Sequence, residues 1–270
     1  MAVPRSSPYI WVTWITGLLA GDRHCLWSAW YRAHFKDYER KPTGFDLAAW
    51  TATHAEMVRT RGQALRDAGC EVFVEGQNKF ALKGRAATLG GVPDLVAVCG
   101  PVGGPGDVDG PAAAHTAREG GPAATGRAMS GAGPAGADAL VIDCKSGRQR
   151  NSDYFQVLTY MLVLPLTHPA CRGRRIAGEI QYRDASVRIE PEKLTDDLKR
   201  LIRTTIEQIA GDEEPPRVPS AGECRFCDLC LGDCPDRIEE DDDGAGDGRG
   251  AGTAGRSGKD SPPGIGHDLF

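Results

Sequence analysis

The stretch that most constrains the fold is a short apolar run ending in charge, Ala-Leu-Val-Ile-Asp-Cys-Lys-Ser-Gly at residues 139–147. In an extended strand, side chains two positions apart share a face, so we expect Asp143 and Lys145 to project together and Ile142 and Cys144 to point the other way. The carboxylate can bind a hard divalent cation. The ammonium group can orient or deprotonate a water and offset charge on a phosphate. A solvated ion pair on a surface strand has the same pattern, so this motif alone does not decide the function.

A second acid precedes another predicted strand. Gly90-Gly-Val-Pro-Asp94 leads into the apolar residues 95–99, which puts Asp94 at a buried strand entrance where an unpaired carboxylate is costly. A turn-capping Asp is the alternative. Residues 101–137 contain 10 Gly, 10 Ala and 5 Pro without hydrophobic periodicity, which predicts a disordered insertion. Without it, about a dozen residues separate Asp94 from Asp143, which suits two adjacent antiparallel strands joined by a hairpin.

The net negative charge of the chain comes from its tail. Residues 236–270 hold nine acids and four bases, which leaves 28 acids and 28 bases in residues 1–235. The neutral body can contact nucleic acid only through a local basic patch. We therefore predict one folded domain, residues 1–235, followed by a disordered acidic tail, residues 236–270.

Periodicity places the remaining elements. It predicts helices from Asp22 through Cys25 to about residue 35, over 46–68 with Asp46 as N-cap, and from Ser152 or Asp153 to Leu164, where Pro165 ends it. We expect strands over 71–82, broken near Gly76, and over 86–89, 176–182 and 186–190, followed by a long helix opened by Pro191. His54 lies on the inward face of its helix, where a lone histidine is more often a hydrogen-bonded core residue than a ligand.

Cysteine usage points to a reducing compartment. Four of nine cysteines lie within residues 224–234, which favours metal or cluster binding over disulfides. Their spacing, C-x2-C-x2-C-x3-C-P, matches the bacterial ferredoxin run, which would use Cys224, Cys227, Cys230 and one remote thiolate. The apolar residues 10–20 are too few to cross a bilayer and do not form a signal peptide. We expect a cytoplasmic protein without membrane contact.

Taken in order, Gly-Val-Pro-Asp94, Asp143-Cys-Lys145 and the Gln156/Tyr160 pair, with His54 before them, resemble the RecB-like branch of the PD-(D/E)XK nuclease superfamily. With Cys25 and residues 224–234, the chain is similar to its iron-sulfur members, the CRISPR-associated RecB-like nucleases and the AddB nuclease domain. The resemblance spans residues 9–235 without the insertion. It implies an α/β (α+β) fold with a restriction-endonuclease-like core, a central mixed sheet flanked by helices, and a cysteine-bound cluster joining the N- and C-terminal parts.

The resemblance also implies roles for individual residues. Mg2+ or Mn2+ would be held by three side chains and one backbone carbonyl, namely His54, Asp94, Asp143 and the carbonyl of Cys144. The catalytic residues would be Asp94, Asp143 and Lys145. Gln156 and Tyr160 would contact the nucleic-acid strand or steady the lysine. The sequence departs from many relatives in its long insertion and in an Asp where they carry Glu.

The resemblance selects a different cysteine set from the ferredoxin run. It pairs an early cysteine with three late ones, so a 4Fe-4S cluster would be bound by Cys25, Cys224, Cys227 and Cys234 and would leave Cys230 spare. Such a cluster would fasten the first helix to the C-terminal part of the domain. A structural zinc ion with four thiolate ligands is the alternative.

These features lead us to expect a metal-dependent DNA nuclease, an exonuclease acting on single-stranded or end-containing DNA. One alternative is a catalytically silent nucleic-acid-binding accessory subunit of a repair or recombination complex, since no G-x-x-x-x-G-K-[ST] motif for ATP binding occurs. Another is an electron-transfer protein built on the ferredoxin-like run. Expected partners are DNA and a helicase or other repair, recombination or CRISPR-adaptation proteins.

Overall fold

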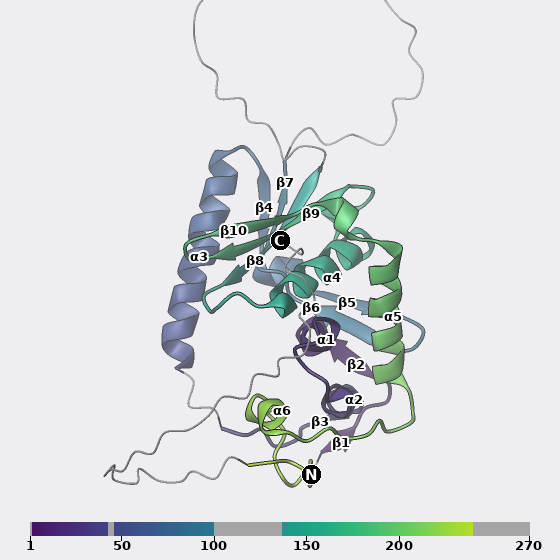
Figure 1. Cartoon of the computed structure of the whole chain (residues 1–270). Coiled ribbons are helices and arrows are strands. Elements are labelled where there is room, and N and C mark those ends of the chain that lie inside the picture. Colours follow the sequence, from purple (N-terminus) through teal and green to yellow (C-terminus); the bar gives the residue numbers. More distant parts are fainter. Residues whose placement is uncertain (1, 43–45, 100–136, 240–270) are drawn as a thin grey trace, which may run out of the picture. The chain divides into compact units, whose positions relative to one another are not determined.

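The computed structural model describes residues 2–42, 46–99 and 137–239 (Figure 1). The chain divides into two units, Met1–Glu239 and Glu240–Phe270, and the second lies outside the described residues. The predicted insertion, apart from Ala137, and most of the predicted tail also lie outside them. The described part is a mixed α+β structure.

The largest sheet has five strands in the order β10-β9-β8-β7-β4. Strands β8 and β9 pair in parallel, and the other neighbours pair antiparallel. The long strand β8 is therefore central. The bounds of the five strands are Glu71–Val74 (β4), Leu95–Val98 (β7), Ala139–Lys145 (β8), Ile176–Tyr182 (β9) and Ser186–Ile189 (β10).

Two smaller sheets accompany it. The first has three strands in the order β2-β6-β5, with bounds Tyr9–Trp11, Thr88–Gly91 and Phe80–Lys83. The second pairs β1 (Val3–Pro4) with β3 (Phe35–Lys36). The strand predicted over 71–82 is thus two strands in different sheets, because a 3-10 turn, η1 (Glu75–Asn78), redirects the chain between β4 and β5.

Six α-helices occur in the described residues. Figure 1 shows α3 on one side of the five-stranded sheet and α4, α1 and α5 on the other. The two sides bury separate apolar clusters, with Ile142 packed toward α3 and Val141 toward α4. The helices are α1 (Val12–Leu19), α2 (Leu26–His34), α3 (Leu47–Asp67), α4 (Asn151–Thr167), α5 (Asp196–Ala210) and α6 (Ala221–Arg225).

The alternation predicted for β8 is confirmed. Ala139 and Val141 belong to the cluster on the α4 side, whereas Leu140, Ile142 and Cys144 belong to the cluster on the α3 side. Helix α4 approaches the sheet closely at β9. A Cβ added at Gly178 would lie 2.3 Å from Val157 Cγ1, so only glycine fits at this crossing.

Asp46 caps α3 as predicted, since its side chain accepts the Ala49 N–H, but four other helix boundaries differ from the sequence predictions. Helix α4 begins at Asn151, ahead of the predicted cap at Ser152 or Asp153. Cys25 is the N-cap of α2 and does not lie in its first turn. Pro165 lies inside α4, which continues to Thr167. Pro191 opens the 3-10 turn η3 (Pro191–Lys193), and the following helix α5 begins at Asp196 behind the capping Thr195. At Pro165 and Pro191, a last helical turn or a short 3-10 turn tolerates a proline that periodicity treats as a helix boundary.

Two further features were not predicted. Cys70 and Cys99 form a disulfide directly beyond the paired ends of β4 and β7. Arg237 is buried and hydrogen-bonded, which extends the folded part past the predicted boundary at residue 235. No helix in the described ranges combines the length and apolar character needed to cross a bilayer.

Candidate functional site

The pairing of β7 with β8 brings the two predicted acids together. Leu95 lies opposite Ile142, so Asp94 at the entrance of β7 faces Asp143 across the two strands. The Asp94 carboxylate accepts a hydrogen bond from the Cys144 N–H at 2.6 Å. The Asp143 side chain is almost fully buried, with 3% of its area exposed. Two carboxylates thus meet where β7 begins and β8 ends, at one end of these two neighbouring strands.

Asp143, Lys145 and Gln156 form a closed network. The Lys145 ammonium lies 2.6 Å from Asp143 Oδ2 and donates to Gln156 Oε1 at 3.0 Å. Gln156 Nε2 in turn donates to Asp143 Oδ1 at 2.8 Å. Since Gln156 comes from α4, the docking of that helix fixes both charged groups. The predicted set on β8 and α4 is therefore brought together.

Tyr160 lies behind this network. It is 2% exposed, and its hydroxyl oxygen accepts a hydrogen bond from Gln156 Nε2 at 3.1 Å. The ring packs edge-to-face against Phe80 at 6.1 Å. A side chain buried in this way cannot contact a substrate directly, so of its two predicted roles the geometry supports steadying Gln156 and Lys145.

Burial and neighbouring charge act in opposite directions on the two ionisable groups of the network. Burial raises the pKa of Asp143 although the charge of Lys145 lowers it. Burial also opposes the charge on Lys145, but the attraction of Asp143, Asp153 and Asp94 outweighs it and leaves the pKa of Lys145 above its ordinary value. Lys145 therefore carries its proton at neutral pH and acts as a donor.

His54 reaches the same end of β7 and β8 from α3. Its Nε2 lies 3.3 Å from Asp94 Oδ1 and 4.0 Å from Glu75 Oε1. The imidazole stacks on Trp50 with ring centroids 5.0 Å apart. The hydrogen bond to Asp94 raises the pKa of His54, and burial only partly offsets it. His54 thus lies between the stacked Trp50 ring and Asp94, which is itself a predicted metal ligand.

Glu75 is a member of the site that the sequence reasoning missed. It follows β4, adopts a positive φ of 39°, and donates its N–H to the Asp94 carbonyl at 2.8 Å. Ligand atoms of His54, Glu75 and Asp94 all lie within 4.8 Å of one another. The sequence places this acid directly before Gly76, where a strand break is predicted, but that pattern does not indicate which residues Glu75 meets.

The compact ligand group therefore differs from the predicted one. Asp143 was expected to share a metal ion with His54 and Asp94, but it turns toward Lys145 and Gln156, and Glu75 completes the group. One nitrogen and two carboxylate donors suit Mn2+ and are compatible with Mg2+. Asp143 lies directly across from Asp94, so a change in its rotamer could add a fourth donor.

A substitution at Glu75 tests this ligand group. We expect Glu75→Gln to weaken Mn2+ binding by at least about 10-fold, the lower limit for loss of even an outer-shell partner. Isothermal titration calorimetry of wild type and variant measures the change. Glu71→Gln, an exposed acid four residues earlier on β4, is the matched control. Equal Mn2+ affinity of the Glu75 variant and wild type would remove Glu75 from the ligand set.

A second cluster of ligating side chains lies elsewhere in the unit. Cys25, Cys224, Cys227 and Cys234 line one cavity, and Cys230 is not among its lining residues. Two donors reach the sulfurs, the Ile238 N–H to Cys224 Sγ at 3.3 Å and Arg32 Nη2 to Cys227 Sγ at 3.6 Å. Four convergent thiols with N–H donors suit an iron-sulfur cluster, whose properties such hydrogen bonds modify.

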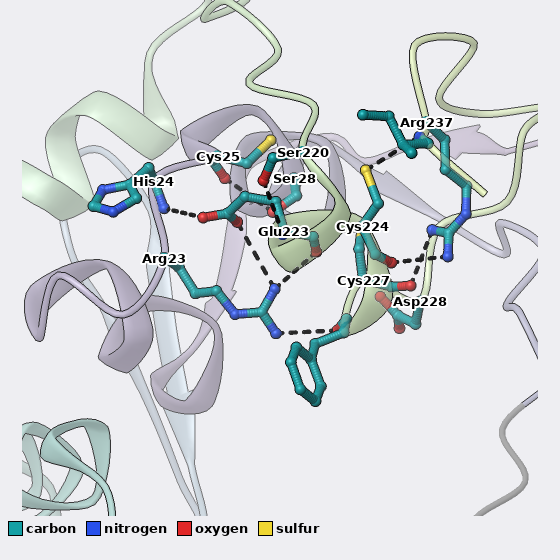
Figure 2. A network of polar contacts seen from close by, with 12 residues as sticks. Arg23, His24, Cys25, Ser28, Ser220, Glu223, Cys224, Cys227, Asp228 and Arg237 are labelled. Atoms are coloured by element: carbon teal, nitrogen blue, oxygen red, sulfur yellow. Dashed lines mark hydrogen bonds and ion pairs between the residues drawn. The ribbon is translucent and has the colours of Figure 1, made fainter. Parts of the chain in front are cut away.

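Arg237 holds the cysteine segment in shape. Its guanidinium donates to the carbonyls of Cys227 at 3.0 Å, Leu229 at 2.6 Å and Cys224 at 2.9 Å. Figure 2 shows Arg237 on one side of the two cysteines and Arg23 on the other. A buried guanidinium bound to three backbone carbonyls fixes the geometry of the loop.

Polar contacts also join this segment to the N-terminal part (Figure 2). Arg23 donates to the carbonyls of Glu223 at 3.0 Å and Phe226 at 3.3 Å. The His24 N–H donates to Glu223 Oε1 at 2.6 Å. These bonds place Cys25 beside Cys224 although the two residues are 199 positions apart in sequence.

Comparison with known proteins adds little. No protein-family model matches the chain, and no curated protein matches it. A solved structure described as "Crystal structure of SSO0001" aligns at 11% sequence identity, covering 87% of this chain and 90% of that chain, with a TM-score of 0.40. A likeness at this score establishes neither the fold nor the function of the chain.

Proposed function

We propose that the protein is a metal-dependent DNA nuclease of the RecB-like, iron-sulfur branch of the PD-(D/E)XK superfamily, with a restriction-endonuclease-like core. The observation that carries the proposal is the Asp143–Lys145–Gln156 network lying beside the His54, Glu75 and Asp94 group. A protonated lysine beside a group of side chains that can bind a divalent cation is suited to phosphodiester hydrolysis. The residues come from α3, η1, the entrance of β7, β8 and α4, so the fold around the sheet assembles them.

The residues divide the work between them. His54, Glu75 and Asp94 would hold Mg2+ or Mn2+, which when bound polarises a phosphoryl oxygen and lowers the pKa of a water. Lys145 donates a hydrogen bond to the negative charge that develops on the phosphate, because its raised pKa keeps it protonated. Gln156 and Tyr160 hold Lys145 in place. Asp143 balances the charge of Lys145.

The cysteine site supports an iron-sulfur cluster, because four thiols line one cavity and N–H donors reach two of the sulfurs. A structural zinc ion with four thiolate ligands is the alternative.

The test is a digestion of defined DNA by anaerobically purified protein. Labelled single-stranded DNA, free or blocked at its 5′ or 3′ end, is incubated with Mg2+ or Mn2+ and separately with a chelator. We expect hydrolysis that needs the metal and an accessible end, as an exonuclease requires. Binding of the same DNA without metal-dependent hydrolysis would overturn the proposal and leave the accessory subunit.

A further inference from the structure

An open groove of about 1010 Å3 borders the Asp143–Lys145–Gln156 network at Gln156, which is one of its lining residues. Its walls come from α1, from the Asp22–Cys25 segment and the helix α2 that follows it, from residues 148–152 at the start of α4, and from α6. Cys25 lines both the groove and the cysteine cavity. The volume exceeds the usual range for small-molecule pockets.

The groove is basic although the body of the protein is neutral. Arg23, Arg32, Arg148 and Arg150 line it, against the two acids Asp22 and Glu223. Arg32 is paired with Asp228, and Arg23 is paired with Glu223 and donates to the carbonyls of Glu223 and Phe226. Arg148 and Arg150 are exposed, and within the described residues neither guanidinium has a hydrogen bond or ion pair. They are free to bind phosphates.

The segment that carries these two arginines is anchored. The Arg150 N–H donates to Asp153 Oδ2 at 3.1 Å, and the same oxygen accepts the Tyr182 hydroxyl at 3.0 Å. Tyr182 ends β9, next to Lys145 at the end of β8. The backbone of the arginine segment is therefore fixed relative to the network.

Aromatic side chains accompany the charge. Trp14 lines the groove, is partly exposed, and makes no ring contact or hydrogen bond within the described part of the chain. Phe226 is 61% exposed, and its ring lies 5.2 Å from the Arg23 guanidinium. Aromatic faces in a basic groove stack unpaired bases, whose faces a duplex hides.

We propose that this groove is the path of a single DNA strand, with phosphates on Arg148 and Arg150 and bases on Trp14 and Phe226. This inference rests on the proposed nuclease function, because it names the form of DNA that reaches the Lys145 network. Arg23 and Cys25 also line the groove, so the contacts of Arg23 drawn in Figure 2 shape the DNA path as well.

The experiment measures binding of fluorescent oligodeoxythymidine by anisotropy, with chelator present so that no hydrolysis occurs. We expect the Arg148→Ala/Arg150→Ala variant to bind at least about 10-fold more weakly and to lower the slope of log Kd against log salt by about 1.4, since each phosphate contact on a single strand contributes about 0.7. Trp14→Ala should weaken binding roughly 5-fold or more and leave the slope unchanged.

Arg85→Ala/Arg172→Ala is the matched control, because it removes the same charge from exposed positions outside the groove. Circular dichroism confirms that each variant folds. Unchanged binding by the Arg148/Arg150 variant, an equal loss in the control, or equal affinity for duplex would overturn the inference. If the Arg148/Arg150 variant binds more weakly but wild type shows no metal-dependent hydrolysis, the nuclease proposal is overturned and the DNA path stands. If wild type hydrolyses DNA but the variant binds it normally, the DNA path is overturned and the nuclease proposal stands.

Discussion

Lys145→Ala is expected to lower the rate of metal-dependent DNA hydrolysis by about 10²- to 10³-fold, the effect of removing one donor to a developing oxyanion. The reason is that Lys145 is the cation at the centre of the network, held by Asp143 and Gln156 and kept protonated by the surrounding acids. Initial rates on labelled single-stranded DNA with saturating Mn2+ measure the change.

Two controls separate a catalytic role from a structural one. Lys83→Ala removes an exposed lysine of β5 and should keep the wild-type rate. DNA binding by Lys145→Ala in the presence of chelator should change by less than the rate, because Arg148 and Arg150 remain. Equal hydrolysis by Lys145→Ala and wild type would show that the catalytic assignment is wrong.

The pairing of the two acids could be predicted because it depends on local patterns. Alternation in residues 139–145 sets the faces of β8, and the chain left after removing the insertion is short enough to make β7 and β8 neighbours. His54 could be placed on the inward face of a helix for the same reason. Each of these inferences uses residues that are close in sequence once the insertion is set aside.

Glu75 and the disulfide could not be predicted because both depend on the pairing of β4 with β7. Between these strands the chain enters the three-stranded sheet through β5 and β6 and returns, and no local pattern indicates which strands pair afterwards. The same pairing sets Cys70 opposite Cys99 and brings Glu75 to the Asp94 carbonyl. The positions of Glu75 and of the disulfide therefore depend on non-local strand pairing, which local sequence patterns do not indicate.

The orientation of Asp143 is a different case. Its position on β8 followed from alternation, but its rotamer depends on Gln156, which α4 brings down onto the sheet. The close crossing at Gly178 sets how near α4 lies. The ligand set that the resemblance implies includes Asp143, which in this structure contacts Lys145 and Gln156, while His54, Glu75 and Asp94 form the compact group.

Cys25→Ser is expected to lose the iron-sulfur cluster and to lower the free energy of unfolding by roughly 2–5 kcal/mol, the range for losing a cross-link of this kind. A cluster on Cys25 and Cys224 would close a loop of 199 positions, which greatly restricts the unfolded chain. The loss should stay below complete unfolding. Trp27 still donates to Glu214 at 2.6 Å and Trp30 to the Gly211 carbonyl at 2.8 Å, so α2 keeps other links to the C-terminal part.

Cys230→Ser is the matched control, because Cys230 belongs to the same segment but does not line the cavity. Iron and sulfide analysis and the visible absorbance of the anaerobic proteins report cluster content, and thermal unfolding followed by circular dichroism reports stability. Cys25→Ser should lose the cluster and unfold at a lower temperature, whereas Cys230→Ser should keep the cluster and the wild-type stability. The opposite pattern would assign the cluster to the ferredoxin-like run of Cys224, Cys227 and Cys230, and zinc without iron in wild type would replace the cluster altogether. Because Cys25 also lines the groove, the Cys25 variant should in addition bind single-stranded DNA more weakly, which links the cysteine site to the path of the substrate.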